Sequence, residues 1–272
     1  MSLKSVKNDL IQIFALAEKD LKLQLRFKIY FVLNLFTSMI IILIPLILMA
    51  LLFKTNPGFG VWTAENFVVY QFIAYNIFLM NGLVTQYPNQ LHLEKFWKTL
   101  PFLMIGSNNR YNILFGRYVS HVISISIPFT FFFILSYIFV RISLVTVFFV
   151  IVSFLLLALI FAGISMLFGV FAISNENLLG LTQFIYPIFM WFTCLMYPFE
   201  IYPPFIQDII NLNPLYHIFY LLRVMWIEDN MIVTITRHPF EFTYLIILAI
   251  VIPMIGVYLF NKIFKRYGIV GY

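Results

Sequence analysis

The stretch LVTVFFVIVSFLLLALIFAGISMLFGVFAI, residues 144–173, contains no charged residue. It is longer than the roughly 20 apolar residues that an α-helix needs to cross the hydrocarbon core of a membrane. A soluble protein of this size has no core that could bury so much apolar surface. The stretch therefore predicts a transmembrane helix.

The rest of the chain has the same character. Of the 272 residues, 62% are hydrophobic and only 10% are charged, whereas soluble domains carry about 25% charged residues. Five more apolar runs are long enough to be spans, at 30–53, 67–84, 118–140, 178–197 and 242–260. The predicted fold class is an all-α integral membrane protein, with residues 1–272 forming one domain of six transmembrane helices.

The basic residues predict the orientation of these spans, because loops rich in Lys and Arg face the cytoplasm. Thirteen of the 17 basic residues fall in three segments: the N-terminal segment, the loop between the second and third spans, and the C-terminal tail. They are Lys4, Lys7, Lys19, Lys22, Arg26, Lys28, Lys95, Lys98, Arg110, Arg117, Lys262, Lys265 and Arg266. We therefore expect a multi-pass protein of the plasma or inner membrane with both termini in the cytoplasm.

Residues 1–28 precede the first span and have an amphipathic pattern. Leu10, Phe14 and Leu21 belong to an apolar face, while most of the charged residues lie elsewhere on the helix. This pattern is typical of a helix that lies in the membrane interface, with its lysines near anionic lipid headgroups.

Two other segments outside the spans carry information. The cytoplasmic loop 88–117 contains LHLEKFWKTL, residues 91–100, which predicts a short surface helix ending at Pro101. The segment 198–239 is too apolar for a solvated loop. Its two helical patterns, 206–212 and 215–227, are too short to span and are separated by Asn213-Pro214. They predict a re-entrant helical pair in the outer leaflet.

Several motifs and residues that other classes of membrane protein require are absent from the sequence. No GxxxxGK[ST] phosphate loop is present, so we expect no nucleotide site, cofactor or enzymatic activity on this chain. All 11 acidic residues lie at or beyond the ends of the predicted spans, which argues against a proton- or sodium-coupled carrier. His121 is expected to be a hydrogen-bonded packing residue rather than a proton relay.

Two further groups could have carried chemistry. Cys194 is the only cysteine, so an intrachain disulfide is excluded. His217 and His238 lie near Glu228 and Asp229 in the sequence, which allows a metal site, but solvated loop charges are the preferred interpretation.

The order of these segments resembles the permease subunit of type-2 ATP-binding-cassette exporters, over nearly the whole chain. Residues 94–100, EKFWKTL, followed by LFGR at 114–117, are similar to the family's Glu-x-x-x-Gly-Thr-Leu-Glu stretch and its later Gly-Lys/Arg. Lys98 stands at the usual Gly and Pro101 at the second Glu. A second pattern, Tyr197-Pro198, Pro203-Pro204, Asn213-Pro214-Leu215 and then Arg223, is similar to the family's outer loop.

The resemblance implies a half-transporter that pairs with a second permease copy, as a homodimer, and with a separate ATPase subunit that binds ATP and Mg²⁺. Membrane lipids and an amphiphilic substrate are the other expected partners, and no nucleic acid is expected. Two groups of site residues follow. The ATPase-coupling residues are Glu94, Lys95, Phe96, Trp97, Lys98 and Thr99, and the outer re-entrant motif consists of Pro203, Asn213, Pro214 and Arg223. The alternative for Phe96 and Trp97 is that they anchor the loop at the lipid headgroups.

The expected function is ATP-driven export of a lipid, hydrophobic drug or peptide. The first alternative is export of a lipid-linked polysaccharide, although residues 25–36 lack the Leu-Gly-x-x-Trp usual in that branch. The second is a secondary carrier or channel, which the missing midplane carboxylates disfavour. A membrane-embedded enzyme acting on lipids would need a catalytic cluster at one interface, and the sequence offers none.

Overall fold

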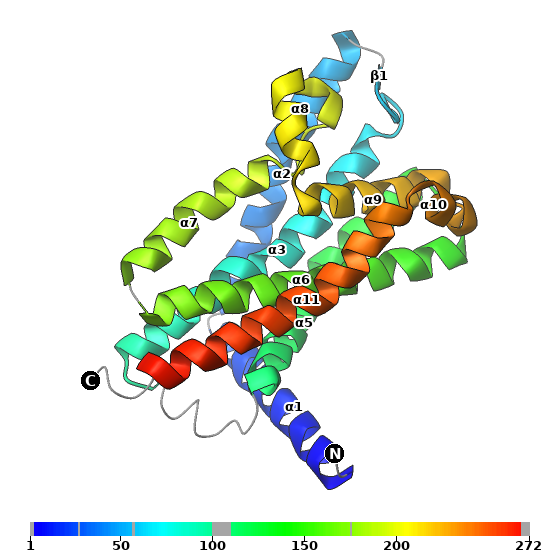
Figure 1. Cartoon of the computed structure of the whole chain (residues 1–272). Helices are drawn as coiled ribbons and strands as arrows, with labels where there is room; N and C mark the ends of the chain where they lie inside the picture. Colours follow the sequence, from blue (N-terminus) through cyan, green and yellow to red (C-terminus); the bar gives the residue numbers. More distant parts are fainter. Residues whose placement is uncertain (1–2, 27, 56–57, 100–109, 175, 268–272) are drawn as a thin grey trace.

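The computed structural model describes residues 3–26, 28–55, 58–99, 110–174 and 176–267. The chain forms a bundle of helices, with a 24-residue helix at one end and several short helices at the other (Figure 1). The elements that run along the bundle are α2 (Lys28–Thr55), α3 (Phe67–Phe96), α5 (Arg110–Phe139), α6 (Leu144–Ser174), α7 (Glu176–Trp191) and α11 (Pro239–Tyr267). The remaining elements are α1 (Leu3–Arg26), β1 (Gly58–Phe59), β2 (Trp62–Thr63), a 3₁₀ turn (Phe199–Ile201), α8 (Pro204–Asn211), α9 (Pro214–Glu228) and α10 (Met231–Arg237).

Within the described residues, four helical segments are long and apolar enough to cross a membrane. They are Phe67–Phe96, Tyr111–Phe139, Leu144–Ala172 and Pro239–Ile263. They coincide with the second, third, fourth and sixth predicted spans, so these four predictions are confirmed. In α2, only Leu43–Thr55 qualifies as a shorter apolar helix, and α7 has 16 residues. The first and fifth spans, and with them the count of six, stay predictions.

The most apolar helix, α6, lies at the centre of the bundle, between α3 and α11 (Figure 1). α6 and α11 cross where two glycines meet. A Cβ at Gly163 would lie 2.6 Å from the backbone nitrogen of Pro253, and one at Gly256 would lie 2.8 Å from the carbonyl oxygen of Gly163. Small residues at such a crossing allow close van der Waals packing, which drives helix association in lipid.

One end of the bundle gathers α1 with the last turns of α3 and α11. Buried Tyr87 and Leu91 of α3 pack there with residues of α5, α6 and α11, including Phe260. α1 crosses the first turns of α5 closely, since a Cβ at Gly116 would lie 2.7 Å from the Cβ of Leu16. We call this the α1 end.

The opposite end of the bundle carries the strands and the short helices α8, α9 and α10 (Figure 1), and we call it the α8 end. β1 and β2 form an antiparallel turn in which Phe59 pairs with Trp62. The Trp62 ring is buried against Tyr70, at the start of α3. The ring nitrogen of Trp226, in α9, donates to the carbonyl oxygen of Val140 at 3.0 Å.

Several boundaries differ from the prediction. The prediction of a separate surface helix at 91–100 is wrong. α3 continues through Phe96, and its residues Tyr87 and Leu91 are buried against neighbouring helices. Most of the predicted loop 88–117 is therefore helical, in α3 and α5, and Pro101 lies outside the described residues. α7 ends at Trp191, before the predicted Tyr197. The segment 198–239 contains α10 in addition to the two predicted helices.

Candidate functional site

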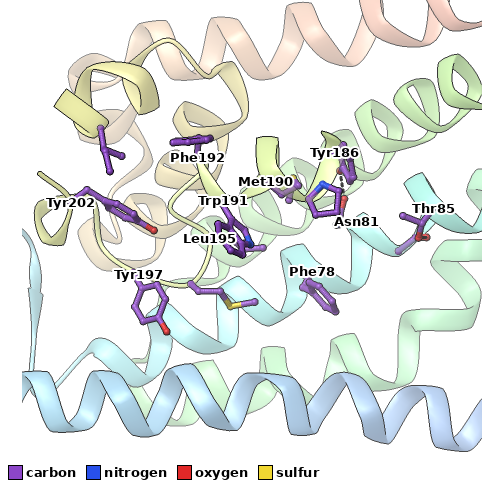
Figure 2. A pocket seen from close by; sticks show the side chains of 14 residues that line it. Phe78, Asn81, Thr85, Tyr186, Met190, Trp191, Phe192, Leu195, Tyr197 and Tyr202 are labelled. Carbon is purple, nitrogen blue, oxygen red and sulfur yellow. Dashed lines mark hydrogen bonds between the residues drawn. The ribbon is translucent and has the colours of Figure 1, made fainter. Parts of the chain in front are cut away.

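An apolar groove with a volume of about 710 Å³ runs between α3 and α7. One wall is formed by Phe78, Asn81, Gly82 and Thr85 of α3. The other wall is formed by Tyr186, Pro187, Met190 and Trp191 of α7 and by the turn that follows it. Leu195, Met196, Tyr197 and Tyr202 line its end near α8 (Figure 2). Most of the lining is aliphatic or aromatic, as expected of a site that takes an apolar ligand.

The groove contains few polar groups. The Tyr186 hydroxyl of α7 donates a hydrogen bond to the Asn81 side-chain oxygen of α3, and this pair lies inside the groove (Figure 2). Further toward the α1 end, the Gln183 amide donates to the Asn89 side-chain oxygen at 2.6 Å. These two bonds connect α3 with α7 along one side of the groove. The arrangement offers contact to an apolar molecule and hydrogen bonding at a few points.

The end of α7 is held by Asn213, which also begins α9. Its side-chain oxygen accepts from the Leu215 N–H at 3.0 Å, so Asn213 is the N-cap of α9, and Pro214 occupies the first helical position. Its amide nitrogen lies 3.3 Å from the carbonyl oxygen of Phe189 and 3.1 Å from that of Phe192. Carbonyls in the last turn of a helix have no partner within the helix. The Asn213 side chain therefore provides hydrogen-bond partners both for a backbone N–H at the start of α9 and for backbone carbonyls at the end of α7.

Arg223 holds the turn after α7. Its guanidinium is buried and donates to the carbonyl oxygens of Cys194 at 2.9 Å and Leu195 at 2.6 Å. The guanidinium carbon lies 3.7 Å from the centre of the Tyr70 ring, and the Tyr70 hydroxyl also donates to the Cys194 carbonyl. Cys194 itself has a positive φ of 53°. The turn that closes the groove is therefore fixed by charge-assisted hydrogen bonds to backbone carbonyls.

Of the four residues in the predicted outer re-entrant motif, the structure brings three close to the turn after α7. Asn213 and Arg223 are buried, Pro214 is half-buried beside them, and Pro203 is exposed where α8 begins. The first two act on the same turn from two points of α9, although they are ten positions apart in the sequence.

At the α1 end, α3 finishes in a Schellman motif. The Thr99 N–H donates to the Glu94 carbonyl at 2.9 Å and the Lys98 N–H to the Lys95 carbonyl at 3.0 Å. Lys98 has a φ of 58°, in the left-handed region where glycine is favoured. This is the position at which the resemblance leads one to expect Gly. Phe96 and Trp97, just before it, are 74% and 63% exposed.

Glu94, in contrast, is largely withdrawn from the surface. Its carboxylate lies 3.3 Å from the Lys19 ammonium and 3.5 Å from the Arg117 guanidinium, which also pairs with Asp20. These four side chains connect α1, α3 and α5. Burial raises the pKa of the Asp20 carboxyl, and the adjacent Arg117 and Lys19 charges act in the opposite direction.

α1 has two faces with different surroundings. Ala17 and Asp20 are buried on the side that packs against α5, where the Asn112 amide donates to Asp9 at 2.8 Å. Leu10 and Phe14 are 50% and 62% exposed, and Leu21 is half-buried. An apolar stripe is thus left uncovered along part of the helix.

The residues that sequence reasoning missed have partners far along the chain. Tyr186 and Asn81 face each other across the groove, and Tyr70 supports the turn at Cys194. Gln71 of α3 donates to the Met196 carbonyl at 2.8 Å. His121 is buried with Nε2 3.0 Å from the Leu79 carbonyl oxygen. Among the described residues, no group of three or more His, Cys, Asp or Glu is placed to hold a metal ion.

Comparison with known proteins identifies the family. A family model described as "ABC-2 type transporter" matches residues 11–226, which cover α2 to α8, most of α1 and α9, and the groove. A search of curated proteins gives no match. Since the match extends over most of the 272 residues, this multi-pass membrane protein belongs to the ABC-2 type transporter family and is a membrane component of an ATP-binding-cassette transporter.

Proposed function

We propose that this chain is the transmembrane subunit of an ATP-driven exporter that moves an amphiphilic molecule (a lipid, a hydrophobic drug or a peptide) across the cell membrane. The observation that carries this proposal is the apolar groove between α3 and α7. Its walls suit a lipid-like chain, and Asn81 with Tyr186 offers one polar point at which a headgroup or amide can bind. The same lining disfavours a hydrated polysaccharide, which needs many hydrogen-bonding partners.

The energy would come from a separate ATPase subunit, which binds ATP and Mg²⁺ and docks at the α1 end. Phe96 and Trp97 support this placement, because they are exposed aromatic side chains at a rigid helix end. α3 also lines the groove, so one continuous helix would connect the docking surface with the substrate path. A push on Phe96 could then shift the wall that carries Asn81.

The proposed topology has six spans and places the α1 end in the cytoplasm. α2 begins after α1 and ends at the β1–β2 turn, while α7 begins after α6 and ends beside α8. Both helices therefore run between the two ends of the bundle, as the four candidate spans do. Because this chain alone does not enclose the groove, we propose that a second copy of this chain completes the substrate path as a homodimer.

A bulky substitution tests the groove. Thr85 is an exposed lining residue of α3, so Thr85→Trp should obstruct the groove without disturbing the core. Ile127→Trp is the matched control, because Ile127 is 73% exposed on α5 and does not line the groove. In vesicles containing the whole complex, we expect ATP-dependent movement of at least one of an amphiphilic dye, a labelled phospholipid or a hydrophobic peptide. Thr85→Trp should reduce that movement at least about tenfold, a loss of about 1.4 kcal/mol.

The outcomes separate the parts of this proposal. Normal transport by Thr85→Trp would show that the groove is not the substrate path. Loss of transport in both variants would point to a general defect and would also contradict the assignment. If the wild-type complex moves none of the three probes, the proposed substrate class is wrong. Steady ATP hydrolysis by this chain purified without a second subunit would overturn the division of labour.

A further inference from the structure

The walls of the groove between α3 and α7 carry no charge. Among the described residues that line it, none is Asp, Glu, Lys, Arg or His. The sequence agrees, because residues 67–91 and 177–199, which supply the two facing walls, contain none of these five residue types. A charged group inside the groove would therefore meet no countercharge on either wall, and burial of an unpaired charge is costly.

The charged side chains closest to the groove in the sequence are engaged elsewhere. The buried Arg223 guanidinium donates to backbone carbonyls. At the α8 end, four ionisable side chains lie within 4.0 Å of one another in pairs and are only 17–24% exposed: His217, Glu228, His238 and Glu241. The interpretation of His217 and His238 as solvated loop charges is therefore wrong. None of these five residues lines the groove.

The polar atoms inside the groove offer both kinds of hydrogen bond. The Tyr186 hydroxyl donates its hydrogen to the Asn81 side-chain oxygen, which leaves the Tyr186 oxygen as an acceptor and the hydrogens of the Asn81 amide as donors. Thr85 lies one helical turn from Asn81, and its hydroxyl donates to the Gly82 carbonyl at 3.3 Å, so its oxygen also remains an acceptor. Donors from one residue and acceptors from two others thus line the same part of the groove (Figure 2).

This polar point lies deep in the bundle. Asn81 is near the middle of α3, which extends from Phe67 to Phe96, so it is roughly 20 Å along the helix from either end. α3 is long and apolar enough to cross a membrane. Near the middle of a span, an ionic group needs a partner of opposite charge, whereas a neutral polar group needs only hydrogen bonds.

An uncharged polar head matches the hydrogen-bonding groups at this point. A hydroxyl or an amide group both donates and accepts. A carboxylate or phosphate only accepts, so its negative charge would face the oxygens of Tyr186 and Thr85. A trimethylammonium head forms no ordinary hydrogen bond, and its positive charge would face the N–H groups of Asn81.

We propose that the groove selects uncharged amphiphiles whose polar head is a hydroxyl or amide group bound by Asn81, Thr85 and Tyr186. The apolar part of the molecule packs against the aliphatic and aromatic lining. Acylglycerol-like and ceramide-like lipids and uncharged drugs or peptides belong to this class, and phospholipids and charged drugs do not. This inference rests on the proposed function, because it takes the groove to be the substrate path.

Photolabelling of the full-length chain in lipid nanodiscs tests the proposal. The probes share one alkyl tail with a photoreactive diazirine and differ in the head, which is glycerol, a primary amide, sulfate or trimethylammonium. A fifth probe has the tail alone. Mass spectrometry measures labelling of α3 and α7 that an excess of the same compound without the diazirine prevents. We expect the glycerol and amide probes to label the groove at least about tenfold more than the two charged probes.

Two variants test the role of Asn81. Asn81→Leu removes the donors, so labelling by the glycerol probe should fall to that of the tail alone, while labelling by the tail alone stays unchanged. Asn89→Leu is the matched control. Asn89 also bonds to α7, through Gln183, but it is exposed and does not line the groove. It should keep the wild-type preference for the glycerol probe.

The outcomes separate this inference from the proposed function. Equal or stronger labelling of the groove by a charged probe would refute the selection for uncharged heads and would leave the groove as the substrate path. An unchanged preference in Asn81→Leu, or the same loss in Asn89→Leu, would refute the role of Asn81. If none of the five probes labels the groove specifically, the groove is not a site for amphiphiles, and the proposed function fails together with this inference.

Discussion

The guanidinium of Arg223 in α9 donates a hydrogen bond of 2.6 Å to the carbonyl oxygen of Leu195, in the turn that follows α7. Leu195 lines the groove, so a helix at the α8 end of the bundle supports one of its walls. Asn213 supports the same wall by donating to Phe189 and Phe192. The short helix α9 therefore shapes the groove although none of its own residues is among those that line it.

Arg223→Ala should lower stability sharply. It leaves the Leu195 carbonyl without this donor in a buried site and removes one of the two donors to the Cys194 carbonyl, which together costs about 3 kcal/mol. The stability of Arg223→Lys should lie between that of the wild type and that of Arg223→Ala, since Lys keeps the charge but has no planar fork of donors. Thermal unfolding in detergent, followed by tryptophan fluorescence, measures the effect. Arg141→Ala, at an exposed arginine, is the control. An unchanged midpoint in Arg223→Ala would rule out this supporting role.

Lys98→Gly should stabilise the end of α3. Lys98 has a φ of 58°, which costs a residue with a Cβ about 1 kcal/mol and costs glycine little. Lys95→Gly provides a control of opposite sign, because Lys95 is still helical and glycine there should cost about 1 kcal/mol. The two variants are compared by thermal unfolding. If both shift the midpoint in the same direction, backbone conformation does not explain the effect.

Replacing both Phe96 and Trp97 with Ala should weaken binding of the ATPase subunit at least about tenfold, since buried aromatic anchors contribute about 2 kcal/mol or more to an interface. Phe205 and Phe240 are similarly exposed, at 67% and 76%, near the α8 end, and their replacement with Ala should leave binding unchanged. A pull-down in detergent measures both. Unchanged binding in the first variant would leave Phe96 and Trp97 as headgroup anchors.

Glu94→Lys should act differently from the aromatic variants. It would place a cation beside Lys19 and Arg117 and leave Asp20 as the only carboxylate in the cluster. We expect a loss of about 2 kcal/mol in stability, because unpaired buried charges are costly. Thermal unfolding is again the measurement, with Glu18→Lys at an exposed position of α1 as the control. Equal effects of the two reversals would mean that the cluster adds no stability.

Spin labels test the placement of α1. Labels at Leu10 and Phe14 should report contact with lipid, and labels at Asn8 and Lys22 should report water, because Asn8 and Lys22 are exposed and are turned away from Leu10 around the helix. Accessibility to oxygen and to a nickel complex distinguishes the two environments in reconstituted vesicles. Similar accessibility at all four positions would contradict an interfacial helix.

The sequence alone determined the class of protein and most of its helices. Apolar composition and run length decide whether a segment can lie in lipid, and both are local properties. The prediction for α6 was therefore close, at 144–173 against Leu144–Ser174. The helices beside Asn213-Pro214 were also predicted, since the capping preference of Asn-Pro is local.

Contacts between distant residues were decided only by the tertiary structure. α3 extends to Phe96 because Tyr87 and Leu91 are buried by helices that follow it in the sequence. α7 ends early because Asn213 and Arg223 take up the carbonyls of its last turn and of the turn beyond it. From the sequence, Glu94 is expected to be an exposed charge at an interface, but ion pairs with Lys19 and Arg117 hold its side chain inside the bundle. The groove has no local signature, because its two walls come from helices about 100 positions apart, and only their packing brings Asn81 to Tyr186.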